Sequence, residues 1–289
     1  MSLYGAMMIG VSALDAFSNA LSTSSSNIAN VNTIGYKSSR TTFKDSLAQL
    51  QRGGAGQGPG QGGGNPAQVG LGTQLGSIDN VMGSGALQST GNATDVAIQG
   101  EGWFRIGQAT VAGTTATLTA GTQQYTRAGN FDRNDQGYLV TADGFYVIGR
   151  TVPSTTVTAT PPGADQLINI PPGASNVAIG QDGSVSYVPA GSTTRTTAGY
   201  ISLAKFPNES GLQRASGNRW TANAASGTEE IGTPGGDFGA TQSGTLEMSN
   251  VDLATEFTNM ISAQRGFQAN SRVISTADDM LNDLVNLKR

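Results

Sequence analysis

Apolar side chains recur every seven residues along the last forty residues of the chain. The repeat comprises five successive positions: Leu253, Met260, Phe267, Ile274 and Leu281. In an α-helix, a strict seven-residue repeat places these side chains in one line, which favours supercoiling with a partner helix. Ser249 can cap the start of such a helix, and Asp252 suits its first turn. Because the stretch 250–289 contains no proline, it predicts a helix of about ten turns that needs a partner.

The first 31 residues carry a matching pattern. Apolar residues again lie seven apart, and Val11, Phe17 and Val31 add part of a second line. The other face is rich in Ser, Thr and Asn and has almost no charge, so an isolated helix would be marginal in water. A helix packed on a globular core would also explain the pattern. The equal spacing, similar length and absence of proline favour pairing with the C-terminal helix instead.

These repeats define the candidate assembly residues. The apolar candidates for the coiled coil and for polymerisation are Met7, Leu14, Phe17, Leu21, Ile28, Val31, Leu253, Phe257, Met260, Phe267, Ile274, Leu281 and Leu284. Polar side chains interrupt the second line of the C-terminal helix and flank the end of the N-terminal one. The polar candidates for contacts between subunits are Asn30, Asn32, Gln264, Arg265, Asn270 and Arg272. We therefore expect one apolar interface within the chain and one mixed interface to neighbouring copies.

The long middle of the chain reads as β structure broken by glycine. Short β-rich runs fill 69–150 and 200–206, and Asp143-Gly144 between two of them is a hairpin signal. Between 36 and 50, Phe43, Leu47 and Leu50 lie four and three residues apart, and eight glycines then crowd into 53–64. The fold class we expect is α+β, with terminal helices paired as a coiled coil and a β-rich middle region inserted between them. The expected parts are 1–36 with 245–289 as the helical inner domain, 37–68 as a linker and glycine-rich loop, 69–150 with 200–244 as the β-rich core, and 151–199 as a small inserted β or loop module.

Composition narrows the function classes. The chain has 289 residues, a net charge of −4, only 12% charged residues, and neither Cys nor His. Catalysis through a Ser-His-Asp or Cys-His arrangement is therefore impossible, as are zinc sites made of His and Cys. The acidic balance argues against a nucleic-acid surface. No apolar run is long enough to insert in a membrane, and no Lys or Arg precedes Lys37, so we expect no cleaved signal peptide.

Three local motifs suggest chemistry but lack its context. Gly58-x-Gly60-x-x-Gly63 matches a dinucleotide fingerprint without the flanking strand and helix. Residues 132–143 resemble part of a calcium loop, but the flanks read as strands and the last position is Asp rather than Glu. The adjacent carboxylates Glu229-Glu230 and Asp278-Asp279 diverge in direction, unlike a glycosidase pair. We expect no catalytic residue, no metal and no cofactor.

Several motifs in order resemble the bacterial flagellar rod and hook proteins. Residues 28–37 (IANVNTIGYK) are similar to the N-terminal signature of this family, and 244–253 (GTLEMSNVDL) to its C-terminal signature. The stretches 98–104 and 125–131 are similar to motifs of its core domain. The matches cover most of the chain apart from about 107–123 and 151–199.

The resemblance implies a structural subunit and not an enzyme. A hook subunit polymerises into a flexible curved tube, a universal joint that carries motor torque from rod to filament and encloses the export channel. The expected partners are further copies in a helical homopolymer, the distal rod protein, the hook cap and hook–filament junction proteins, and the flagellar type III export apparatus. The expected location is the hook and basal body, outside the cell.

Within this family we favour the hook, with a rod subunit as the alternative. The block 65–72 looks like the hook protein's version of that region, and 37–50 and the ending 284–287 also favour the hook. The chain is nevertheless short beside many hook proteins, and rod proteins have similar lengths. A β-rich adhesin is a third class, for which we expect an anchor or cleaved signal and no paired seven-residue repeats.

Overall fold

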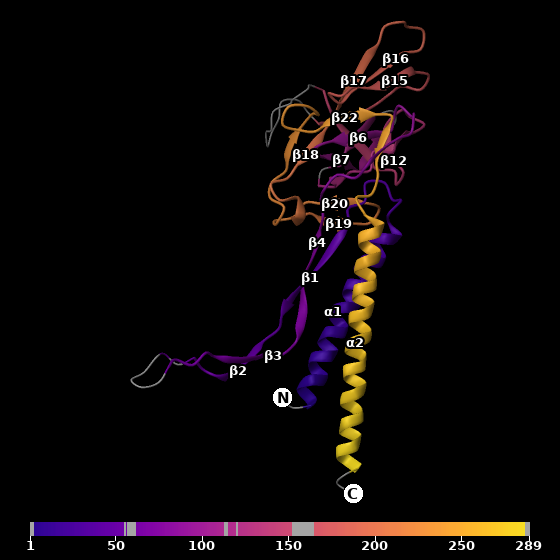
Figure 1. Cartoon of the computed structure of the whole chain (residues 1–289). Coiled ribbons are helices and arrows are strands. Elements are labelled where there is room, and N and C mark those ends of the chain that lie inside the picture. Colours follow the sequence, from indigo (N-terminus) through magenta and orange to yellow (C-terminus); the bar gives the residue numbers. More distant parts are fainter. Residues whose placement is uncertain are drawn as a thin grey trace. The chain divides into compact units, whose positions relative to one another are not determined.

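A computed structural model describes residues 3–54, 56, 62–112, 115–119, 121–151 and 165–286. The order of elements is helix, β region, helix, as the sequence predicts (Figure 1). The chain divides into two compact units. We call Met1–Ala29, Ser39–Val81 and Val251–Arg289 the helical unit, and Asn30–Ser38 with Met82–Asn250 the β unit.

The two terminal helices lie side by side in the helical unit (Figure 1). Helix α1 is Leu3–Ala29 and helix α2 is Leu253–Asn286. They run in opposite directions, because Gly10 of α1 faces Ile274 while Phe17 faces Gly266. The predicted terminal helices are confirmed, whereas their supercoiling stays a prediction.

Asp252 caps the start of α2, a role that we expected from Ser249. Its carboxylate accepts hydrogen bonds from the Ala254 N–H at 3.0 Å and the Thr255 hydroxyl at 2.7 Å. The Thr255 hydroxyl lowers the pKa of Asp252, and the backbone N–H of Ala254 adds to that shift. A carboxylate at this place also matches the positive end of the helix dipole.

Two antiparallel strand pairs form an arm in the helical unit, which we define as residues 39–80. Strand β1 (Ser39–Asp45) pairs with β4 (Thr73–Asn80), and β2 (Ala48–Arg52) pairs with β3 (Ala67–Gly70). We expected a linker and glycine-rich loop over 37–68, and β-core strands only from residue 69. Half of the stretch 53–64 lies outside the described residues. The Thr and Phe side chains of β1 favour extended backbone, and pairing with β4 fixes it.

Short strands make up the β unit. Among the described residues, thirteen strands form one sheet, whose main path runs β15-β16-β17-β13-β7-β10-β20-β19. The elements of this unit are β5 (Leu87–Ser89), β6 (Val96–Gln99), β7 (Trp103–Gly107), β8 (Ala109–Ala112), β9 (Thr115–Leu118), β10 (Gln124–Thr126), β11 (Phe131–Arg133), β12 (Leu139–Thr141), β13 (Tyr146–Arg150), β14 (Asp165–Leu167), β15 (Ser175–Ile179), β16 (Ser184–Val188), β17 (Thr196–Ile201), β18 (Leu203–Lys205), the 3-10 turn η1 (Glu209–Gly211), β19 (Gln213–Ala215), β20 (Arg219–Thr221), β21 (Glu230–Gly232), β22 (Ala240–Ser243) and β23 (Thr245–Glu247).

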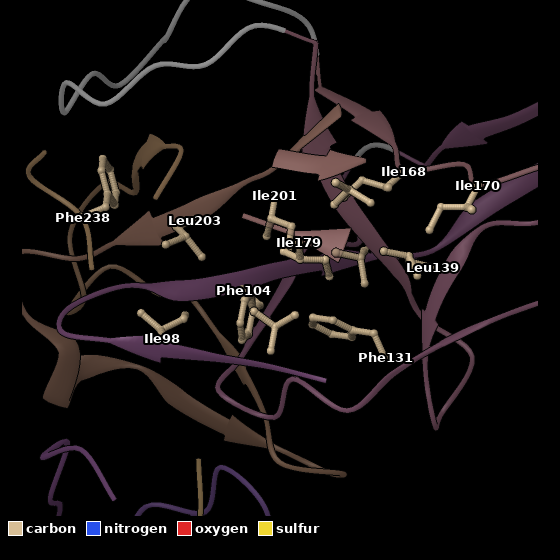
Figure 2. Close-up of a cluster of buried hydrophobic side chains, with 13 residues drawn as sticks. Ile98, Phe104, Phe131, Leu139, Ile168, Ile170, Ile179, Ile201, Leu203 and Phe238 are labelled. Atoms are coloured by element: carbon tan, nitrogen blue, oxygen red, sulfur yellow. The ribbon is translucent and has the colours of Figure 1, made fainter. Parts of the chain in front are cut away.

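Large side chains fill the interior of the β unit. Phe104 and Phe131 meet edge to face with ring centroids 5.1 Å apart, inside a cluster of aliphatic residues (Figure 2). A second cluster holds Trp103 and Trp220, with centroids 5.7 Å apart. The predicted turn at Asp143-Gly144 is confirmed, because β12 and β13 pair antiparallel around it. The calcium-like motif 132–143 contains most of β11 and all of β12, which pair antiparallel with each other.

The β unit extends beyond the expected boundaries of the β-rich core. Residues 30–36 and 245–250, which we expected in the helical domain, and residues 37–38, which we expected in the linker, make their contacts in the β unit. Strand β17 pairs with β13, and β14 does so as well. The part of 151–199 that is described therefore continues the large sheet, while 152–164 lies outside the described residues.

Candidate assembly surfaces

Small residues make the contact between α1 and α2. Ala13 and Ala16 of α1 and Ala263 and Ala277 of α2 are buried. A methyl group added to Gly10 would lie 2.9 Å from the Ile274 side chain, closer than real contacts allow. The helices therefore approach closely, and many of their large apolar side chains lie outside the seam.

The predicted apolar candidates differ in exposure, and those of α1 are more buried than most of those of α2. Those of α1 are half-buried, as are Val31, Met260 and Ile274. Four candidates of α2 are exposed by 36% to 50% of their surface: Leu253, Phe257, Phe267 and Leu281. The side chain of Leu284 lies outside the described residues. Val11, which we placed on the second apolar line of the N-terminal helix, is also exposed, as are further large side chains outside the repeat, namely Tyr4, Met8, Ile261, Val273, Met280 and Val285.

The polar candidates lie in two places. Gln264, Arg265 and Arg272 are exposed on α2, and Asn270 is half-buried with its amide donating to the Gly266 carbonyl at 2.8 Å. Asn32 is exposed, and Asn30 is half-buried and accepts a hydrogen bond from the Thr33 hydroxyl. These two asparagines belong to the β unit, whereas the α2 group belongs to the helical unit.

The arm is a second apolar surface, which the sequence did not lead us to predict. Phe43, Leu47, Leu50 and Ile78 are between 46% and 73% exposed. The root of the arm is fixed to α1, because the Phe17 and Phe43 rings lie 6.0 Å apart and the Thr41 hydroxyl donates to that of Thr23. The signal that predicts it is symmetry: β-rich runs flank the glycine-rich stretch on both sides.

A largely buried ionic network stabilises the interior of the β unit. Nη2 of Arg105 and Nη1 of Arg150 lie 2.9 and 2.8 Å from the two carboxylate oxygens of Asp165. The Tyr125 hydroxyl donates to Glu229 at 2.6 Å. Burial, together with Glu229, raises the pKa of Tyr125 well above its ordinary value. Each charge in this network faces an opposite one, so the network ties strands together and offers no free base or nucleophile.

Hollows on both units are lined mostly by Thr, Ser, Asn and small side chains. A cavity of about 450 Å³ in the β unit is lined mainly by Asn, Thr and small residues, with the Asp143–Arg219 ion pair at its rim. Within the described ranges, no three acidic, His or Cys residues gather as metal ligands would. No helix among those residues has the length and apolar character to cross a membrane.

A β unit with a closed core and a helical unit with exposed apolar faces are typical of a structural subunit that completes its burial against other copies. Protein-family profiles match three parts of the chain. Residues 7–37 match the profile "Flagella basal body rod protein", 97–187 match "Flagellar hook protein FlgE/F/G D1 domain", and 242–287 match "Flagellar basal body rod FlgEFG protein C-terminal".

Full-length relatives agree with these profiles. The chain is 44% identical to the flagellar basal-body rod protein FlgG of Bacillus subtilis (strain 168), over 97% of each chain. It is 39% identical to the protein of that name from Caulobacter vibrioides, over 89% of each. It is 29% identical to the flagellar hook protein FlgE of Brucella suis, over the whole of both chains. The chain therefore belongs to the bacterial flagellar rod and hook family, a family of structural proteins of the flagellum.

Proposed function

We propose that this chain is a subunit of the flagellar rod and not of the hook. The supporting observation is the way the relatives align. The Bacillus rod protein aligns over 282 residues, close to the full length of 289. The alignment with the hook protein needs 411 positions, so the hook protein carries long stretches without a counterpart here.

This proposal reverses the preference that we drew from sequence motifs. The hook-like stretch 65–72 and most of 37–50 fall on the arm, which is a small part of the chain. The comparisons favour the rod over the hook because the rod relatives match along nearly the whole chain at higher identity. Short motifs shared within a family separate its members less well than full-length similarity does.

In the proposed rod, each subunit adds to a helical homopolymer through its helical unit. The exposed apolar side chains of α2 and of the arm supply the driving force, at about 25 cal/mol per Å² of buried apolar surface. In the proposed polymer these surfaces bind different surfaces of neighbouring copies. Such a heterologous contact generates an open helix when the rotation from copy to copy does not close into a ring. The function is mechanical, namely the transmission of torque, and no reaction is assigned to the chain.

The proposed partners follow from that place in the flagellum. They are further copies of this chain, the neighbouring rod and hook proteins at its two ends, and the type III export apparatus that delivers flagellar subunits. The proposed location is the flagellar basal body.

Electron microscopy of the purified polymer tests the proposal. Under polymerising conditions, we expect straight tubes rather than curved ones. In a strain lacking the gene, we expect basal bodies with an incomplete rod and no hook, and the full chain restores both. Curved tubes, or complete rods that lack only the hook, would identify the chain as a hook subunit.

A further inference from the structure

Three charged side chains meet in the interior of the β unit. Nζ of Lys37 lies 2.7 Å from Oε1 of Glu247, and Nη1 of Arg127 lies 3.2 Å from Oε2 of the same carboxylate. All three side chains are at least 97% buried. Lys37 also donates to the Gly83 carbonyl at 2.9 Å, and Arg127 to the Gly100 carbonyl at 2.9 Å.

Segments from both ends of the chain are joined around this cluster. The Gly35 N–H donates to the backbone carbonyl of Glu247 at 2.8 Å, and the Ser38 N–H donates to the Asn250 side chain at 2.8 Å. The Gly85 N–H donates to the Glu247 carboxylate at 3.0 Å. A Cβ atom at Gly35 would overlap the backbone of Ala128, so this segment is seated closely on the core. Residues 30–38 and 244–250 are thus held together, although more than 200 positions separate Lys37 from Glu247.

The charge balance of the cluster depends on Glu247. Burial lowers the pKa of Lys37, Glu247 raises it, and Arg127 lowers it further. Two cations share one buried carboxylate, so its loss leaves both cations buried, with only the weaker influence of Glu209 on Lys37 to oppose their charge. Such a site is strongly unfavourable, whereas replacing all members of a buried ionic group by apolar residues is often neutral.

We propose that Glu247 acts as a lock that closes the β unit only when the C-terminal segment docks. Lys37 and Arg127 prevent residues 30–38 from packing on the core until the Glu247 carboxylate lies between them. The same contacts fix the register between the two segments, so Lys37 and Glu247 are positioning residues. The lock concerns the folding of one unit, and it does not depend on whether the subunit serves in a rod or a hook.

Hydrogen exchange of the full-length protein tests the lock. The useful probes are the Gly35 and Ser38 amides, because their acceptors survive a change at residue 247. The Leu139 N–H, which donates to the Ile168 carbonyl at 3.1 Å in the core, serves as a reference. Glu247→Leu should speed exchange at Gly35 and Ser38 at least tenfold more than at Leu139. Glu247→Gln keeps the shape and one acceptor, and it should have a smaller effect of the same kind.

The rescue variant separates the lock from ordinary stabilisation. Lys37→Met/Arg127→Met/Glu247→Leu carries no charge at the site, so it should recover most of the protection at Gly35 that Glu247→Leu loses. The control Glu101→Gln removes an exposed pair with Lys205 and should leave Gly35 unchanged. If Glu247→Leu unfolds the whole unit, recovery by the triple variant still decides the matter. Equal acceleration at Leu139 in a unit that remains folded, no acceleration at Gly35, or a triple variant no better than Glu247→Leu would each overturn the proposal.

Discussion

The two units bury opposite kinds of side chain. In the β unit the buried residues are large, and Trp103 and Phe104 are completely enclosed. In the helical unit the buried apolar side chains are alanines such as Ala16 and Ala263, while Phe257 and Ile261 are each 50% exposed. Both units belong to one short chain, so the difference does not come from overall composition.

This difference indicates where each unit completes its folding. Burial of a large apolar side chain contributes about 1.5–3 kcal/mol, and the β unit obtains that contribution within one subunit. We expect the large apolar side chains of the helical unit to make this contribution in contacts with other copies. Mutations in the β unit should therefore change the stability of the free subunit, and mutations on the outer faces of the helical unit should change assembly.

The largest expected effect is loss of assembly in Phe257→Asp. The variant places a charge where we expect the polymer to bury an aromatic side chain, so polymerisation should be abolished at concentrations where the parent assembles. The free subunit should keep its thermal midpoint within about 2 °C, because the effect of exposed substitutions is usually small. Sedimentation of polymer and circular dichroism of the subunit measure the two quantities.

A matched control is Thr258→Asp, which adds the same charge at the next position, where the exposed hydroxyl already bonds to the Ala254 carbonyl. It should assemble. Normal polymers from Phe257→Asp would contradict the assignment of this face to assembly.

The second effect belongs to the β unit. Phe104→Ala removes a fully buried ring that packs against Phe131, and it should lower the free energy of unfolding by about 3–5 kcal/mol. Urea denaturation followed by tryptophan fluorescence reports this unit, since both tryptophans lie in it. The corresponding truncation of an exposed ring in the helical unit, Phe43→Ala, should change the unfolding of that unit, followed by helical circular dichroism, by less than about 1 kcal/mol. Similar losses from both would remove the contrast between the units.

The sequence predicts the helices well because their signal is local. A seven-residue repeat without proline is sufficient to place α1 and α2 within a few residues. It does not say which partner covers each side chain, because the repeat records burial in the polymer and in the subunit together. We expected the line of Leu253, Met260, Phe267, Ile274 and Leu281 to face α1. Ile274 does lie against Gly10, whereas Leu253, Phe267 and Leu281 are 36% to 40% exposed, and the buried apolar residues of the two helices are alanines.

Contacts between segments that are far apart in the sequence could not be predicted from local patterns. The arm needs pairing between β1 and β4, and nothing local to residues 39–45 names that partner. The Lys37–Glu247 pair likewise joins residues 210 positions apart, and neither segment has an unusual composition. Composition and motifs were sufficient for the family and for the absence of His- and Cys-based chemistry. Full-length comparison was needed to favour rod over hook.

A smaller effect tests how closely α1 and α2 approach. Gly266→Ala adds a methyl group 2.6 Å from the Phe17 ring, which must move although it also packs near Phe43. Helix propensity favours alanine by about 1 kcal/mol, and overpacking costs about 1–3 kcal/mol. We expect a net loss of about 1 kcal/mol in the helical unit, measured by helical circular dichroism on heating. The double variant Gly266→Ala/Phe17→Leu should recover it, whereas a stabilised single variant would show that the helices have room to spare.

The smallest effect is a pH dependence confined to the β unit. Because the folded state raises the pKa of Tyr125 above its ordinary value of 10.0, the phenol stays protonated after the unfolded chain has lost that proton. The stabilising contribution of Tyr125 is therefore fully present below pH 10 and is lost as the pH rises toward the folded pKa. Tyr125→Phe lacks this dependence and also the bond to Glu229, so it should be less stable than the parent by about 1 kcal/mol at pH 8. Urea midpoints followed by tryptophan fluorescence at pH 8, 10 and 11 should show that gap narrowing, and a constant gap would mean that Tyr125 ionises at its ordinary pKa in the folded unit.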